Sequence, residues 1–107
     1  MAVLAEFELR VLLSVLRAGD EAYAVAVHET LERRTGRRAS LGAVYITLDR
    51  LERKGLLASR LGEPTAERGG RAKRYYRATR AGTAAAREES RVLRRLLDGL
   101  DVLTDKR

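Results

Sequence analysis

Three glycines divide the first half of the chain into segments of helix length. Gly19, Gly36 and Gly55 each follow a stretch whose apolar residues recur at intervals of three and four. Such intervals place side chains on one face of a helix, and glycine is common just past a helix C-terminus because it adopts the left-handed backbone freely. The pattern predicts three short consecutive helices, at residues 6–18, 21–35 and 40–54.

The apolar stripes and polar caps of these segments indicate how each helix would lie. Asp20 and Ser40 are suited to cap the second and third helices, because their side-chain oxygens can accept hydrogen bonds from free backbone N–H groups. The residues expected to face the core are Leu9, Leu12, Leu13 and Leu16 on the first helix and Leu41, Val44, Leu48 and Leu51 on the third.

The pattern changes after Gly55 to two short β-type segments. Residues 56–61 and 73–79 predict strands, the second containing the aromatic pair Tyr75-Tyr76. One of these tyrosines should be in the core, because neighbouring side chains in a strand leave opposite faces. The intervening GEPTAERGGRA is too long for a tight turn, so we expect a β-hairpin with a projecting, mobile, basic loop.

A last helix is predicted over residues 80–103, capped by Thr79. Its length would be about 36 Å at 1.5 Å per residue, more than so small a domain could cover. We therefore expect a mainly α fold with a small β-hairpin, a unit 1–79 followed by a dimerisation helix within 80–107. The residues expected at the dimer interface are Leu4, Phe7, Val92, Leu93, Leu96, Leu97, Leu100 and Leu103.

The positive charge of the chain is concentrated in one segment. The 107 residues have a formal net charge of +7, yet residues 1–36 contain six acids and four bases, whereas residues 68–80 contain six bases and no acid. Such a segment attracts polyanions, above all a nucleic-acid backbone. The alternative is a solvated basic loop.

Composition excludes several other classes. The chain has no cysteine and therefore no disulfide or thiolate metal site, and its lone His28 has no second histidine to share a metal. No apolar run is long enough to span a bilayer. The N-terminus has acids before its first base, unlike a secretory signal, so we expect a cytoplasmic protein. Binding of the basic segment to DNA would make the protein nucleoid-associated. No pair of catalytic groups stands out, and we expect neither an enzyme nor a cofactor.

Two linked motifs resemble a known family. Residues 44–57, VYITLDRLERKGLL, and residues 74–82, RYYRATRAG, are similar to the recognition helix and the wing of the PadR family of bacterial transcriptional regulators. The resemblance implies a winged helix-turn-helix and a homodimer built through one long C-terminal helix, as in the smaller subgroup of that family. It also implies repression of nearby genes from a pseudo-palindromic operator.

Members of the family often respond to small hydrophobic or phenolic compounds at the dimer interface, so the resemblance also implies a possible, unidentified hydrophobic effector. The chain departs from the family pattern at Ala22, where Gly is frequent, and at Ile46, where Pro is frequent. It also has no Trp, which members that bind flat aromatic drugs can use at the dimer interface. This last departure weakens the expectation of a planar drug pocket.

The DNA contacts follow from the helix-turn-helix geometry, in which the second helix of the motif enters the major groove. The helix at 40–54 and the basic wing at 62–74 would bind double-stranded DNA, with Tyr45 on a phosphate as the resemblance implies and Ile46 against a thymine methyl group. Tyr45 as a tyrosine at the edge of the core and Arg50 in an ion pair with Asp49 or Glu52 remain alternatives. The residues expected at DNA are Arg37, Arg38, Ser40, Gly42, Ala43, Tyr45, Ile46, Arg50, Arg68, Arg71, Lys73 and Arg74.

Two other classes of protein fit the same charge distribution. An architectural protein, or one that binds RNA, would use the basic segment without choosing a sequence, and its binding would depend steeply on salt. A dimeric protein-interaction module would dock the segment on an acidic partner and retain no duplex at low salt.

Overall fold

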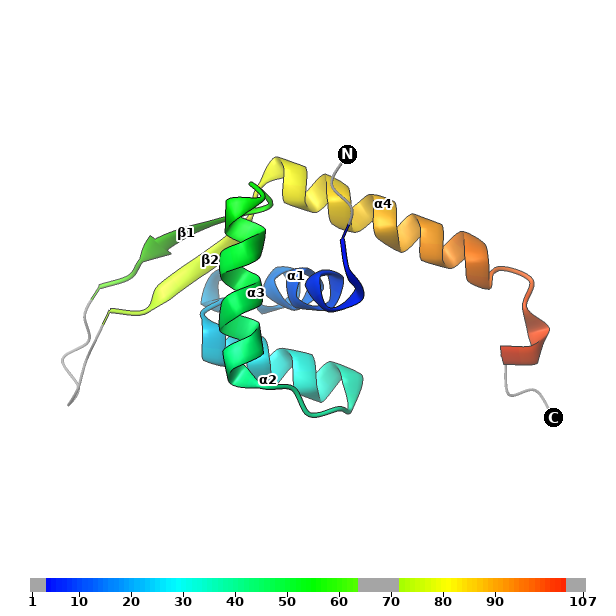
Figure 1. The fold of residues 1–107 in the computed structure, drawn as a ribbon, viewed down its shortest axis with the longest axis horizontal. Coiled ribbons are helices and arrows are strands. Elements are labelled where there is room, and N and C mark those ends of the chain that lie inside the picture. Colours follow the sequence, from blue (N-terminus) through cyan, green and yellow to red (C-terminus); the bar gives the residue numbers. More distant parts are fainter. Residues whose placement is uncertain (1–3, 64–71, 104–107) are drawn as a thin grey trace.

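The computed structural model describes residues 4–63 and 72–103, and the expected mainly α fold with a β-hairpin is confirmed within them. Three helices form a compact group, the hairpin leaves it on one side, and a fourth helix passes across it and extends beyond it (Figure 1). The elements are α1 (Glu6–Ala18), α2 (Ala24–Thr35), α3 (Leu41–Arg53), β1 (Leu57–Leu61), β2 (Arg74–Ala78) and α4 (Arg80–Leu97), with 3-10 turns at Gly19–Glu21 and Asp101–Leu103.

The core lies where α1, α2 and α3 meet the base of the hairpin. Each helix contributes aliphatic side chains that are completely or almost completely buried, and Tyr76 contributes the largest ring from β2. The fully buried side chains of largest volume are Val11, Leu12, Val15, Val27, Val44, Leu48, Leu51 and Leu57.

The bounds of α1 are as predicted, but its apolar stripe is only half right: Leu12 is buried and Leu9 packs against the core, whereas the other two predicted residues face outward. Leu13 and Leu16 are each 41% exposed, whereas Val11 and Val15 are buried beside Leu12. Nearly every residue from 11 to 16 is apolar, so two faces satisfy helical spacing equally well. The buried face is the one that contains Glu8, whose carboxylate pairs with Lys54 at the end of α3.

The second helix begins three residues later than predicted, and Asp20 is not its cap. Residues 19–21 form a 3-10 turn and Tyr23 is the residue before the helix. The reason is an extended segment beside β2: the N–H of Tyr76 donates to the carbonyl oxygen of Ala22, and Tyr23 forms an isolated β-bridge with Tyr75. Because the bridge requires extended backbone at Tyr23, which has φ −100° and ψ 166°, the helix begins at Ala24.

The third helix matches its predicted bounds closely. Ser40 Oγ accepts a hydrogen bond from the N–H of Ala43, which confirms the predicted cap, and Gly55 has a left-handed φ of 78°. The core stripe is confirmed at Val44, Leu48 and Leu51. The first member of the predicted stripe, Leu41, is exposed instead, and the side chain of Thr47 is buried.

The hairpin is antiparallel, with Leu57 opposite Ala78 and Leu61 opposite Arg74. Of the tyrosine pair, Tyr76 is the core residue and Tyr75 lies half-buried on the other face, as the alternation predicts. Burial raises the pKa of the Tyr76 hydroxyl, and the nearby charge of Glu52 adds to the shift, so this side chain stays neutral at physiological pH. The residues of the predicted projecting loop from 64 to 71 lie outside the described part of the chain.

The last helix is shorter than predicted. Thr79 Oγ1 accepts from the N–H of Gly82, as expected for a cap, but the helix ends at Leu97 rather than at residue 103. Gly99 adopts a left-handed φ of 80°, which ends the helical path, and a 3-10 turn follows. No helix in the described segments is long and apolar enough to cross a membrane.

One close approach joins α4 to the hairpin. A Cβ atom on Gly82 would lie 2.0 Å from the carbonyl oxygen of Leu56, an oxygen that also accepts from the N–H of Thr79. Only glycine allows the first turn of α4 to lie so close to this backbone. The glycine that ends the RYYRATRAG motif is therefore required by packing.

Candidate nucleic-acid interface

The outer face of α3 is exposed and mixed in character. Tyr45 is 52% exposed and Ile46 61% exposed, while the opposite face of the same helix is buried in the core. Two small residues, Gly42 and Ala43, precede this pair. Gly42 is exposed and Ala43 is partly covered. The small side chains allow the first turn of the helix to approach another surface closely, and the two large side chains can then contact that surface.

Arg50 lies on the same outer face, and the ion pair considered for it does not form. Asp49 instead pairs with Arg53 at 2.7 Å, and the carboxylate of Glu52 accepts from Ser59 Oγ at 2.8 Å. Within the described segments the side chain of Arg50 makes no hydrogen bond or ion pair, although its charge acts on the carboxylate of Glu8. Its guanidinium is thus available to a partner on the exposed side of α3.

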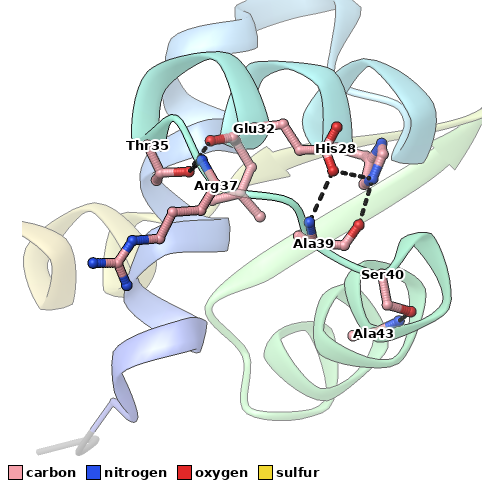
Figure 2. A network of polar contacts seen from close by, with 8 residues as sticks. His28, Glu32, Thr35, Arg37, Ala39, Ser40 and Ala43 are labelled. Atoms are coloured by element: carbon pink, nitrogen blue, oxygen red, sulfur yellow. Dashed lines mark hydrogen bonds and ion pairs between the residues drawn. The ribbon is translucent and has the colours of Figure 1, made fainter.

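The turn between α2 and α3 brings four of the predicted contact residues together. Here a hollow of about 340 Å³ opens between this turn and α1, floored by Phe7 and Leu31. The backbone N–H of Arg37 donates to Thr35 Oγ1 in this turn (Figure 2). The predicted contact residues that line the hollow are Arg37, Arg38, Ser40 and Ala43.

The far end of α3 is held by a partly buried ion pair that was not predicted from the sequence: the Glu8 side chain is 4% exposed and the Lys54 side chain 34% exposed. Lys54 Nζ donates to both carboxylate oxygens of Glu8, at 2.8 and 2.9 Å, and the N–H of Ala5 donates to the same carboxylate. Burial alone would raise the pKa of Glu8, but these hydrogen bonds and the charges of Lys54 and Arg50 outweigh it and hold the pKa below its ordinary value. The one sequence feature that could have indicated this pair is Glu8, an acid on the face of α1 that also contains the buried residues Val11, Leu12 and Val15.

An aromatic and cationic cluster lies on the hairpin, toward the end of the strands that is nearer to the connecting loop. The rings of Tyr23 and Tyr75 meet edge to face at 5.6 Å, with Lys73 Nζ 4.2 Å from the Tyr23 ring centre and the Arg60 guanidinium 4.9 Å from that of Tyr75. Cations over aromatic faces are attracted by the ring quadrupole. The contacts tie the hairpin to the N-terminus of α2.

Lys73 and Arg74, both predicted to bind DNA, interact with different neighbours on opposite sides of the hairpin. Arg74 Nη1 donates to Ser59 Oγ, on the hairpin side that also contains Tyr76, whereas Lys73 lies over Tyr23 on the other side. Both side chains are exposed. Arg68 and Arg71, the residues predicted for the tip of the wing, lie outside the described residues.

The residues predicted for the dimer interface divide into two groups. Leu4 is 8% exposed and belongs to the chain's own core, and Phe7 is half-buried against it, so both offer little surface to a second copy. The C-terminal group is exposed along one side of α4 and the turn that follows it: Val92, Leu93, Leu96, Leu97, Leu100 and Leu103.

The described residues contain no group of three or more His, Asp or Glu side chains that could hold a metal ion. His28 has a structural partner instead, since its Nε2 lies 2.7 Å from the carbonyl oxygen of Ala39.

Comparisons with known proteins agree with this architecture. Transcriptional regulator Rv3488 of Mycobacterium tuberculosis is 49% identical over 63 residues, a match that covers 59% of this chain and only 55% of that protein. A PadR family transcriptional regulator from Eggerthella lenta has a similar solved structure, with a TM-score of 0.68 and 29% identity over 94% of this chain and 89% of that one. A PadR-like transcription factor from Bacteroides fragilis, 23% identical, shares the fold with a TM-score of 0.68 over 90% of this chain and 89% of that one. The model of the transcriptional regulator PadR-like family matches residues 12–88, and the chain therefore belongs to the PadR-like family of transcriptional regulators.

Proposed function

We propose that this protein is a homodimeric repressor that binds a pseudo-palindromic DNA operator through α3 and the basic wing. The observation that supports this most directly is the outer face of α3, where Tyr45 and Ile46 are exposed on a helix whose other face is fixed in the core. Large exposed side chains on a rigid helix are suited to the major groove, which admits an α-helix.

The contacts of this helix divide by chemistry. Gly42 and Ala43 allow the N-terminal turn to approach the bases, and Ile46 contacts a thymine methyl group. The hydroxyl groups of Ser40 and Tyr45, with the guanidinium groups of Arg37 and Arg38, reach phosphates and set the register of the protein on the duplex.

The wing supplies a second set of contacts. Arg68 and Arg71 would enter the minor groove, whose narrowness concentrates negative potential, and Lys73 and Arg74 would lie along the backbone. The contact of Lys73 with the Tyr23 ring holds the hairpin against the start of α2, which supports the proposed placement of the wing on DNA.

The dimer is proposed from the apolar side of α4. Its C-terminal half exposes leucines in a row, with Leu96 66% exposed, and a second copy would cover them. A two-fold dimer would set the two α3 helices about 34–36 Å apart, one turn of DNA. A hydrophobic effector that relieves repression would bind near this interface.

The test is selection of duplexes from a random-sequence library by the purified full-length protein. We expect an enriched pseudo-palindrome bound about 1,000-fold more tightly than its scrambled version at physiological salt. Ile46→Ala should weaken binding of the enriched duplex about tenfold and relax the choice of base at one position, because one methyl contact is lost. Asp49→Ala, on the same exposed face, is the control for general disturbance of α3 and should bind as tightly as wild type or more tightly, because it removes a negative charge and releases Arg53.

The other outcomes are distinct. Equal affinity for all sequences with a steep salt dependence would indicate an architectural protein and contradict sequence-directed regulation. No retained duplex at low salt would indicate a protein-interaction module. Sedimentation of the free protein as a monomer at micromolar concentration would contradict the dimer.

A further inference from the structure

The backbone of Ala39 is held at both of its polar groups by two side chains of α2. Its N–H donates to Glu32 Oε2 at 2.8 Å, and its carbonyl oxygen lies 2.7 Å from His28 Nε2. The two side chains also meet each other, with Nε2 and Oε2 3.4 Å apart. Figure 2 shows these contacts as a closed triangle between the helix and the turn that follows it.

The chemistry of the triangle fixes the role of each group. A carbonyl oxygen only accepts, so Nε2 of His28 must be the protonated nitrogen that donates. Glu32 is one helical turn beyond His28, which places both side chains on the same face of α2. The side chains of His28 and Glu32 are 20% and 34% exposed, so both are partly shielded from water.

The position of Ala39 gives these contacts their significance. The next residue, Ser40, is the cap of α3, and Ser40 Oγ accepts from the N–H of Ala43. The N–H and the carbonyl oxygen of Ala39 belong to the two peptide units on either side of its Cα atom. Because each unit is held by one hydrogen bond, the backbone dihedral angles of Ala39 between them are restrained. With Lys54 bound to Glu8 at the other end, α3 is anchored to α2 where it begins and to α1 where it ends.

We propose that His28 and Glu32 form a positioning clamp that fixes the angle at which α3 presents its outer face to DNA. The proposal rests on the proposed function. The clamp residues act through Ala39 and Ser40 and need not touch the duplex themselves. Their effect therefore appears in the discrimination between DNA sequences more than in attraction to DNA in general, because base contacts depend on the angle of the helix more than phosphate contacts do.

The direction in which one substitution changes the affinity for DNA distinguishes the clamp from a simple effect of net charge. Glu32→Ala removes a negative charge, which alone would tighten binding to DNA. Glu29→Ala removes the same charge from an exposed site on α2 and is the matched control. We expect Glu32→Ala to bind the duplex enriched by the wild-type protein about tenfold more weakly than wild type does, and Glu29→Ala to bind it as tightly or more tightly. His28→Ala should weaken binding in the same direction.

Two further measurements separate positioning from loss of the fold. Affinity for the scrambled duplex should change by less than about twofold in both clamp variants. Glu32→Gln should restore the affinity for the enriched duplex, because the carboxamide oxygen still accepts from the N–H of Ala39. Glu32→Ala that binds as tightly as Glu29→Ala overturns the clamp, as does equal weakening on the enriched and scrambled duplexes.

Amide hydrogen exchange of the wild-type protein tests the clamp without any variant or DNA. The N–H of Ala39 should exchange at least about tenfold more slowly than that of Arg38, which has no hydrogen-bond partner among the described residues. Equal exchange at the two positions overturns the clamp. If the library yields no enriched duplex, the proposed function fails, and this measurement alone decides whether the turn is held as described.

Discussion

The helices α3 and α4 are both amphipathic, but they use their apolar faces in opposite ways. In α3 the apolar side chains are buried against α1 and α2, and its exposed face contains Tyr45, Ile46 and Arg50. In α4 the buried residues are Gly82 and Ala86, both in its first half, and the leucines of its second half are exposed. Figure 1 shows that this second half extends past the group of helices that α3 belongs to.

The anchoring of the two helices differs in the same way. Both ends of α3 are tied to neighbouring helices, by the triangle at Ala39 and by the ion pair between Lys54 and Glu8. In the second half of α4 the ion pair is the local one between Arg91 and Glu88. A helix that is rigidly held suits a precise contact, whereas a helix with an uncovered apolar face suits association with a second copy.

The largest expected effect is loss of the proposed dimer through a substitution in the apolar row of α4. Leu96→Glu places a charge in the centre of the exposed apolar row, and a symmetric dimer contains the change twice. We expect the dissociation constant of the dimer to rise about 1,000-fold, equivalent to about 4 kcal/mol, measured by sedimentation equilibrium. Arg94→Ala changes the net charge by the same amount on the polar side and should leave the dimer intact. An unchanged dissociation constant for Leu96→Glu would show that this row is not the interface.

A smaller effect is expected at the joint between the two regions. Gly82→Ala would place a methyl group 2.0 Å from the carbonyl oxygen of Leu56, so the backbone must shift. We expect the free energy of unfolding to fall by about 3 kcal/mol in urea titrations. Gly42→Ala, where the new atom would meet only Ser40 Oγ at 3.5 Å, is the matched control and should be neutral or slightly stabilising. Equal effects of the two substitutions would contradict the close approach.

The smallest effect is expected at the anchor of α3 and depends on pH. The pKa of Glu8 is lowered on folding, because the hydrogen bonds and charges that favour the carboxylate outweigh the effect of burial. The contribution of the pair to stability is therefore fully present above the unfolded pKa of about 4.3 and is lost as the pH falls through the lower folded value. The difference in unfolding free energy between wild type and Glu8→Gln should be constant above about pH 5 and shrink below it.

Lys54→Met is the companion to that measurement, because it removes the main partner of the carboxylate and should reduce the same pH dependence. A difference between wild type and Glu8→Gln that is independent of pH down to 3 would mean that the ion pair does not contribute to the anchor.

The sequence predicted the elements better than their contacts. The bounds of α1, α3 and the hairpin, the glycine stops and the caps at Ser40 and Thr79 are local features, and they are confirmed. The start of α2 and the end of α4 were wrong, because pairing of residues 22–23 with β2 and the left-handed backbone at Gly99 decide them.

The candidate site shows the same division. The exposed face of α3 follows from helical spacing alone, and the predicted exposure of Gly42, Ile46 and Arg50 is found. The contacts that hold this helix were not foreseen, since Glu8 and Lys54 are 46 residues apart and Ala39 is held through its backbone. Every residue other than proline has the backbone N–H and carbonyl oxygen that Ala39 uses in these contacts. The identity of residue 39 therefore does not reveal them.

The sequence by itself determined the helices, the ends of α1 and α3, the basic segment and the motifs of the PadR-like family, because spacing, capping and charge act between near neighbours in the chain. Only the tertiary structure decided which face of α1 is buried, which of Tyr75 and Tyr76 enters the core side of the hairpin, and how α3 is anchored. These choices depend on contacts between distant segments, where several local solutions are equally good and the packing of the whole selects one.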